Sequence, residues 1–145
     1  MQASIRLEHH LLAVEAEHRV HAMLELVAPP APATHQRPPL HLALVIDRSG
    51  SMAGPKLETT KECAAFLVRR LAPTDELALV TYDDEVQLLS PLVAVGDAGQ
   101  SLLQVIGGIF PGGSTNLSGG WLKGMEALRA TNGAGPRKVL LLTDG

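Results

Sequence analysis

The chain has 145 residues and a formal net charge of −3, and 46% of its residues are hydrophobic while 19% are charged. This composition is typical of a globular protein that is long enough for one core of ordinary size. The charge is too small to indicate a nucleic-acid partner, and aromatic residues, at 3%, are too few to form a base-stacking surface.

The apolar runs are far shorter than a membrane span, so we expect none. Residues 1–12 lack the basic region and apolar core of a secretory signal. Cys63 is the single cysteine, which excludes an internal disulfide and favours a reducing, cytoplasmic compartment.

Residues 1–27 are predicted to form a β-hairpin segment, with strands at 4–14 and 18–27 and a turn at 15–17. In the second strand, apolar residues alternate with His21, Met23 and Glu25, which predicts one buried face. All six histidines lie within the first 41 residues, but no cysteine accompanies them. We therefore interpret them as a polar surface rather than a zinc site. Residues 28–39 are rich in proline and are predicted to be an extended linker.

Residues 42–46 form a short apolar run that includes β-branched residues, which predicts a buried strand at 40–46, and the run stops at Asp47. Ser49 and Ser51 follow, with Gly50 between them to allow a tight loop. A carboxylate and two hydroxyls form an all-oxygen set that suits Mg²⁺ or Mn²⁺ better than zinc. The alternative is an ordinary turn, in which such residues are common.

The next elements alternate between helices and strands. A helix begins at Pro55 and ends before Pro73, because proline is favoured at a helix start and stops a helix. A buried strand is predicted at 76–82, a short antiparallel edge strand at 86–89, and a helix at 98–108.

A glycine-rich loop at 111–120 then leads into a helix. Asn116 is its expected N-cap, and its apolar face is predicted to hold Leu117, Trp121, Met125 and Leu128. A third buried strand, at 138–142, runs into Asp144, as the first strand ran into Asp47. No phosphate-binding glycine motif is present, which argues against nucleotide binding.

The pattern Asp47-x-Ser49-x-Ser51, then Thr115 in a glycine-rich loop, then Asp144 after a strand, resembles the von Willebrand factor type A domain with its metal-ion-dependent adhesion site. The amino-acid sequence of these motifs is similar to that of the bacterial branch of the family. The resemblance covers residues 39–145, with the domain itself at 40–145, and implies an α/β fold with a doubly wound, mostly parallel, Rossmann-like sheet. The implied strand order is 86–89, 76–82, 40–46, 138–142.

The resemblance also implies a function without catalysis. Ser49 and Ser51 would hold Mg²⁺ or Mn²⁺ directly, and Asp47, Thr115 and Asp144 would bind it directly or through water. A free coordination position would take an Asp or Glu carboxylate from a partner protein. Arg48, on the same loop, is expected to be solvated or to contact that carboxylate. We further expect removal of the Asp47 charge to raise stability in metal-free buffer, because clustered carboxylates repel.

A complete domain of this family has two further strands with helices after the position of Asp144. We therefore expect the domain to be incomplete at its C-terminal side, and the 138–142 strand to present an open edge. Such an edge favours self-association or pairing with a completing chain.

Two alternative functions stay open. One is a truncated structural remnant whose site is unused. The other is a Mg²⁺-dependent phosphoryl-transfer enzyme with Asp47 as nucleophile. Against the enzyme, position 49 is Ser where haloacid dehalogenase-type hydrolases carry a second Asp, and the glycine-rich loop has no Lys.

Overall fold

A computed structural model describes residues 2–7, 21–27, 37–131 and 133–144. The chain divides into two compact units, Met1–Arg37 and Pro38–Gly145. Most of the predicted linker, residues 28–36, and the predicted turn at 15–17 lie outside the described residues.

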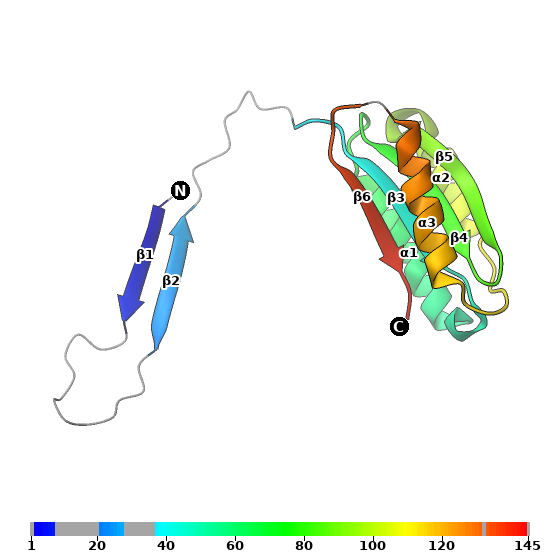
Figure 1. Ribbon diagram of the computed structural model, residues 1–145, viewed down its shortest axis with the longest axis horizontal. Coiled ribbons are helices and arrows are strands. Elements are labelled where there is room, and N and C mark those ends of the chain that lie inside the picture. The colour runs from blue at the N-terminus through cyan, green and yellow to red at the C-terminus, as the bar shows by residue number, and fades with distance from the viewer. Residues whose placement is uncertain (1, 8–20, 28–36, 132, 145) are drawn as a thin grey trace. The chain divides into compact units, whose positions relative to one another are not determined.

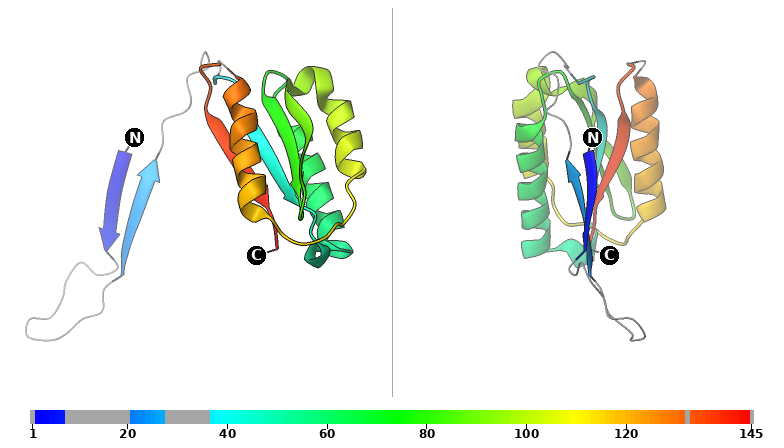
Figure 2. Two further views of the ribbon diagram at one scale, coloured as in Figure 1. Left: turned by 45° about the vertical axis from the view of Figure 1, so that its right-hand side comes forward. Right: turned by 90° about the vertical axis from the view of Figure 1, so that its left-hand side faces the viewer.

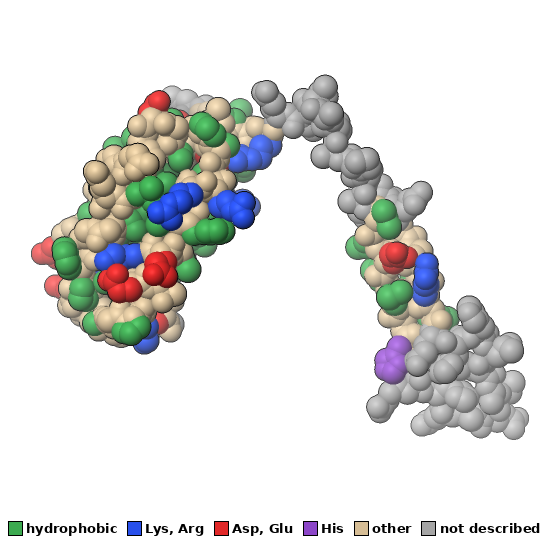
Figure 3. Space-filling model, turned by 180° about the vertical axis from the view of Figure 1, so that it is seen from behind, with side chains coloured by type: hydrophobic (Ala, Val, Ile, Leu, Met, Phe, Trp, Pro, Cys, Tyr) green, Lys and Arg blue, Asp and Glu red, His purple; other side chains and the backbone are tan. Residues whose placement is uncertain are grey.

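The first unit contains an antiparallel pair, β1 (Gln2–Leu7) and β2 (Ala22–Val27), in the register Gln2 to Val27 and Leu7 to Ala22. This confirms the paired strands but not the buried face, because every described residue of β2 is exposed. Ile5 and Leu24 are 70% and 60% exposed, and apolar side chains are visible on the surface of this unit (Figure 3). A two-stranded sheet has no second layer to cover either face.

Two of the six histidines lie among the described residues. His21 and His41 are described, whereas the other four histidines lie outside the described residues. The interpretation as a polar surface fits His21, which is exposed, but is wrong for His41, which is 3% exposed and whose Nδ1 lies 2.6 Å from Glu76 Oε2. Among the residues that the structure describes, no group of three or more His, Cys, Asp or Glu side chains is placed to hold a metal ion.

The second unit contains a four-stranded sheet in the order β5-β4-β3-β6, as the sequence predicts (Figure 1). The strands are β3 (His41–Asp47), β4 (Glu76–Tyr82), β5 (Val86–Ala94) and β6 (Arg137–Leu142). β3 pairs in parallel with both β4 and β6, and β5 runs antiparallel to β4.

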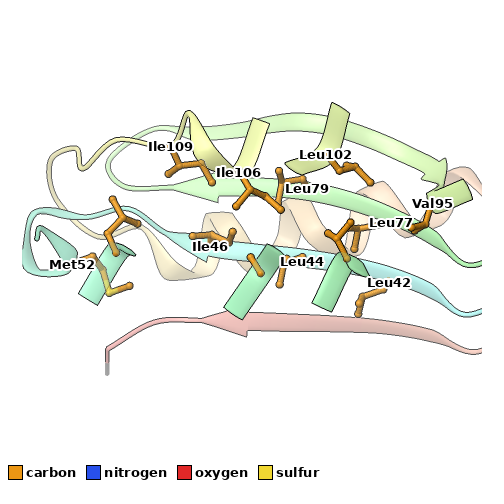
Figure 4. Packing of buried hydrophobic residues seen from close by; sticks show 13 residues of the cluster. Leu42, Leu44, Ile46, Met52, Leu77, Leu79, Val95, Leu102, Ile106 and Ile109 are labelled. Carbon is orange, nitrogen blue, oxygen red and sulfur yellow. The ribbon is translucent and has the colours of Figure 1, made fainter. Parts of the chain in front are cut away.

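Helices cover both faces of this sheet, which confirms the doubly wound α/β class (Figure 2). α1 (Pro55–Arg70) and α2 (Val95–Gly107) lie on one face, and α3 (Leu117–Ala127) lies on the other. Short 3₁₀ turns, Gly50–Met52 and Leu128–Ala130, flank α1 and α3. Successive side chains of a strand point to opposite faces. Leu42, Leu44 and Ile46 therefore pack with the α1 and α2 residues (Figure 4), while Ala43 and Val45 pack on the α3 side.

The strand predicted at 86–89 is longer than expected, since β5 continues through Pro91 to Ala94. An edge strand tolerates proline because its outward N–H needs no partner. The pairing of β5 with β4 also shifts register around Leu79, which marks a bulge. α2 follows directly and begins at Val95 rather than at Ala98.

The predicted buried face of α3 is wrong for three of its four residues. Leu117, Trp121 and Met125 are 43%, 41% and 41% exposed, and only Leu128 is buried. The helix instead turns Gly120 and Gly124 toward the sheet. A Cβ on Gly120 would lie 2.5 Å from the Tyr82 ring, and one on Gly124 would lie 2.7 Å from Val45. The absence of side chains lets α3 approach the sheet closely.

β6 is the strand that was predicted at 138–142, but it is not buried as predicted. Its residues are exposed or half-buried, and Leu140 is 39% exposed. Within the described part of the chain, β6 pairs with β3 alone and is an edge of the sheet.

Candidate functional site

The carboxyl ends of the parallel strands meet at one edge of the sheet. Asp47 is the last residue of β3 and is the register partner of Tyr82, the last residue of β4. Thr143 and Asp144 follow β6, which is parallel to β3. The C-terminal end of the described chain lies beside the start of α1 in Figures 1 and 2. Segments nearly 100 positions apart in the chain thus meet at this edge.

Asp47 is the buried anchor of the site, with 1% of its surface exposed. Its Oδ1 accepts a hydrogen bond from the Ser49 backbone N–H at 2.8 Å. Its Oδ2 accepts from the Tyr82 hydroxyl at 3.1 Å and from the Thr143 hydroxyl at 2.9 Å. A buried carboxylate needs such donors to offset its loss of hydration. Asp47 is therefore fixed by three neutral donors.

A line of polar groups leads from this anchor to the surface. The hydroxyl oxygens of Ser49 and Ser51 lie 3.1 Å apart. The Ser51 hydroxyl donates to Asp144 Oδ1 at 3.3 Å, and Lys56 Nζ donates to Asp144 Oδ2 at 2.5 Å. The Lys56 ammonium, together with the Ser51 hydroxyl, holds the pKa of the Asp144 carboxyl below its ordinary value. Ser49 is buried, whereas Ser51 and Asp144 are exposed, so the outer half of the line is open to solvent.

The glycine-rich loop lies against the Asp47 loop through its backbone. Gly50 N–H donates to the Gly113 carbonyl at 2.7 Å, and Gly112 N–H donates to the Arg48 carbonyl at 2.6 Å. Thr115 is exposed on this loop, and the described residues show no hydrogen bond from it to the other four predicted ligands. The predicted N-cap is confirmed, since Asn116 Oδ1 accepts from Gly119 N–H at 3.0 Å.

Asp83 joins the two loops and was not predicted as part of the site. Its side chain, 5% exposed, accepts from the Arg48 guanidinium at 3.0 Å, from Glu85 N–H at 2.9 Å and from Gly113 N–H at 3.2 Å. Burial raises the pKa of Asp83, but these donors outweigh it and hold that pKa below the ordinary value. A Cβ on Gly112 would overlap the Asp83 carboxylate, which explains the glycine there.

Arg48 was expected to be solvated or to meet a partner carboxylate, and the structure corrects this expectation. Its side chain is only 20% exposed and is paired with Asp83. Arg48 thus ties the Asp47 loop to the end of β4.

Tyr82 and Thr143 are two further residues that the sequence did not identify. Burial, assisted by the nearby Asp47 carboxylate, raises the pKa of Tyr82 to about 12. The phenol therefore stays protonated and donates to Asp47 at any physiological pH. The parallel register of β3 and β4 was the only available signal for Tyr82, and Thr143 carried no signal beyond its position before Asp144.

The arrangement fits a small divalent cation on chemical grounds. Asp47, Ser49, Ser51 and Asp144 offer oxygen atoms only, which is the donor type that Mg²⁺ and Mn²⁺ prefer. The Lys56 ammonium already lies at Asp144, so a positive charge is stabilised at this position. The exposure of Ser51 and Asp144 gives an ion access from solvent.

Comparison with known proteins places these residues in a family. A family model for the von Willebrand factor type A domain matches residues 42–145. Inter-alpha-trypsin inhibitor heavy chain H1 of Mesocricetus auratus is 34% identical over 113 residues, which span 72% of this chain and 12% of that protein. The uncharacterized protein sll0103 of Synechocystis is 34% identical over 112 residues, which span 76% of this chain and 26% of that protein. The chain thus spans only about an eighth and about a quarter of the length of these two relatives.

A similar fold occurs in the vWF domain of the type V pili tip protein Mfa5 from Porphyromonas gingivalis. The TM-score is 0.68 with 24% identity, covering 77% of this chain and 39% of that one. The cytoplasmic location expected from the sequence stays a prediction. Within the described part of the chain, no helix has the length and apolar character that crossing a membrane requires. Bacterial relatives are present as predicted, although the animal heavy chain matches with equal identity.

Proposed function

Because the chain belongs to the von Willebrand factor type A domain family, we propose that its site holds Mg²⁺ or Mn²⁺ and that the chain binds a carboxylate of a partner protein there. Domains of this family are commonly protein-interaction modules. The proposed ligands are Asp47, Ser49, Ser51, Thr115 and Asp144.

The observation that carries this proposal is the continuous contact from Ser49 to Ser51 and on to Asp144. Ser51 and Asp144 are 93 positions apart in the chain, yet their side chains are hydrogen-bonded. A surface turn would need no such convergence of oxygens from two strand ends. When bound, the cation would supply a positive charge with an exchangeable position for a partner carboxylate.

The proposed ligands have different roles in the site. Asp47 is immobilised by its three donors and fixes the inner side of the site. Ser51 and Asp144 face solvent and form the outer side. Thr115 lies on a loop whose backbone is hydrogen-bonded to the Asp47 loop at Gly112 and Gly113.

The burial of Asp47 argues against the phosphoryl-transfer alternative. A nucleophilic carboxylate needs an accessible oxygen aimed at the substrate. Asp47 is 1% exposed, and both of its oxygens accept hydrogen bonds from the protein. A bridging water could still connect such a carboxylate to a cation, whereas attack on a phosphate needs direct contact. The unused-remnant alternative differs from the proposal only in binding, and the first test below separates them.

The first test is titration calorimetry with Mn²⁺ on the wild type, Asp47→Asn and Asp97→Asn. Asp97 is an exposed carboxylate in the first turn of α2, so its variant controls for the loss of a surface charge. We expect Asp47→Asn to weaken Mn²⁺ binding by roughly tenfold or more, because changes around metal sites commonly cost that much. Equal affinity in all three proteins would contradict the metal site.

The second test concerns the partner. Proteins captured by the immobilised chain in Mg²⁺ should be released by EDTA, and they should bind Ser51→Ala poorly even in Mg²⁺. Capture that is unchanged by EDTA and by Ser51→Ala would rule against the carboxylate-bridging mode, whatever the calorimetry shows.

A further inference from the structure

We propose that Lys56 is a resident counter-cation of this site, which neutralises Asp144 in the metal-free protein and has to leave that carboxylate before a divalent cation can use it. Lys56 would thereby set the affinity of the site for metal. The inference rests on the proposed function, and its test separates the failure of one from the failure of the other.

The contact geometry places the Lys56 ammonium on a proposed ligand. Lys56 Nζ lies 2.5 Å from Asp144 Oδ2, while Asp144 Oδ1 accepts from Ser51 at 3.3 Å. Both oxygens of Asp144 are therefore engaged by protein donors. Ser51 is itself a proposed ligand, so its contact can be kept when a cation binds, whereas the ammonium competes directly with that cation.

The position of Lys56 in α1 is unfavourable for a lysine. It is the second residue of the helix, where the positive end of the helix dipole repels cations. Lys61, by contrast, pairs within the same helix with Glu58 at 3.0 Å. The pairing partner of Lys56 lies 88 positions away, outside the helix, and offsets the unfavourable position.

The charges at this edge of the sheet assign Lys56 its role. The hydrogen bonds to Asp47 come from neutral groups, namely the Ser49 N–H and the Tyr82 and Thr143 hydroxyls. In the described part of the chain, Asp144 pairs with the Lys56 ammonium, and no cationic side chain pairs with Asp47. A divalent cation would balance both carboxylates by itself, and the ammonium would then add an uncompensated, repelling charge.

The pair is also easy to separate. The side chain of Lys56 is 57% exposed, and that of Asp144 is 21% exposed. Exposed ion pairs contribute little net stability, and the flexible stem of lysine allows the ammonium to return to water. The Arg48–Asp83 pair, at 20% and 5% exposure, is far better shielded and is not expected to exchange.

The test compares Lys56→Met with Lys61→Met, which removes the same charge from the same helix. Mn²⁺ calorimetry should show Lys56→Met binding roughly three- to tenfold tighter than the wild type and Lys61→Met, from the repulsion between like charges at short range. Lys56→Arg, which keeps a cation, should bind like the wild type. At a fixed Mn²⁺ concentration, the rise in melting temperature over the EDTA sample should also be larger for Lys56→Met than for Lys61→Met.

Each other outcome has a defined meaning. If Lys56→Met and Lys61→Met bind Mn²⁺ equally, the counter-cation role is overturned while the proposed function stands. If Lys56→Met binds more weakly than Lys61→Met, Lys56 assists binding, and the competition is likewise overturned. If no protein in the series binds Mn²⁺, the proposed function itself fails and this inference fails with it.

Discussion

β3 and β6 are parallel neighbours, and each leads into an aspartate at the same edge of the sheet. All seven residues of β3 are buried, whereas those of β6 are exposed or half-buried. Asp47 after the buried run is 1% exposed and is held by three neutral donors. Asp144 is exposed and is held by one hydroxyl and one ammonium.

The difference follows from the position of the two strands in the sheet. β3 lies between β4 and β6, so its end is enclosed by neighbours that supply donors. β6 is an edge strand among the described residues, so the residues after it face solvent. The same local sequence pattern therefore yields an inner carboxylate that is held by three neutral donors and an outer carboxylate whose ammonium partner can exchange. Such a pair is suited to holding an exchangeable ion.

The largest expected effect tests the two strands directly. Leu44 and Leu140 are register partners, and they are 0% and 39% exposed. Leu44→Ala should lower the free energy of unfolding by about 2–5 kcal/mol, the usual cost of a buried cavity. Leu140→Ala should cost about 1 kcal/mol or less, because its site is already in contact with water. Urea unfolding measures both, and similar losses would show that β6 is as well covered as β3.

The second prediction compares the two carboxylates in EDTA. Asp47→Asn should cost about 1–3 kcal/mol, because the amide N–H₂ cannot accept the hydrogen bonds that one carboxylate oxygen now accepts. Asp144→Asn should change stability much less, since its partners are exposed. This reverses the expectation that loss of the Asp47 charge stabilises the metal-free protein, which ignored the donors around Asp47. Thermal unfolding in EDTA decides, and a stabilised Asp47→Asn would restore the earlier expectation.

The third prediction concerns Asp83, a second buried carboxylate held by several donors. The pKa of Asp83 is lowered in the folded state from its ordinary value of 3.8. Its negative charge therefore stabilises the fold at pH values above that ordinary pKa. That contribution is lost as the pH falls below about 4 and protons bind the folded carboxyl. At pH 7, Asp83→Asn should cost about 1 kcal/mol through the loss of charge-assisted hydrogen bonds. Between pH 7 and pH 3, the variant should lose less stability than the wild type, and parallel pH profiles would exclude this role.

The sequence predicts much of this fold because its signals are strong where burial is complete. The strands predicted at 40–46 and 76–82 contain the apolar runs 42–46 and 77–80, and β3 and β4 match the predicted strands to within one residue. The face of α3 was missed because the contact is made by Gly120 and Gly124, which hydrophobic periodicity does not register. The edge strand predicted at 86–89 is too short because Pro91 usually signals a break, although an edge strand tolerates proline, and β5 continues to Ala94.

The sequence predicts those site residues that directly follow a strand, but not those whose side chains reach the site from other elements. Asp47, Ser49, Ser51 and Asp144 could be placed at one edge from topology alone. Tyr82 required the strand register, whereas the contacts of Thr143, Lys56 and Arg48 required side-chain positions. Whether Thr115 joins the other four ligands stays a prediction.

The smallest expected effect on stability concerns the open edge of β6. The two edges of the sheet differ, since β5 contains Pro91 and a bulge, features that discourage pairing with another chain. β6 is regular and apolar at its centre. The 145-residue chain is therefore expected to pair with a second copy of itself through β6.

Leu140→Lys tests this edge, with Leu88→Lys on β5 as the matched control, because the two leucines are 39% and 40% exposed. Both variants should change the free energy of unfolding by about 0.5 kcal/mol or less, as exposed substitutions usually do. A lysine on an edge strand opposes pairing, so only Leu140→Lys should lower the average mass measured by sedimentation at high concentration. If the wild type sediments as a monomer at every concentration, or if both variants reduce its mass equally, association does not proceed through β6.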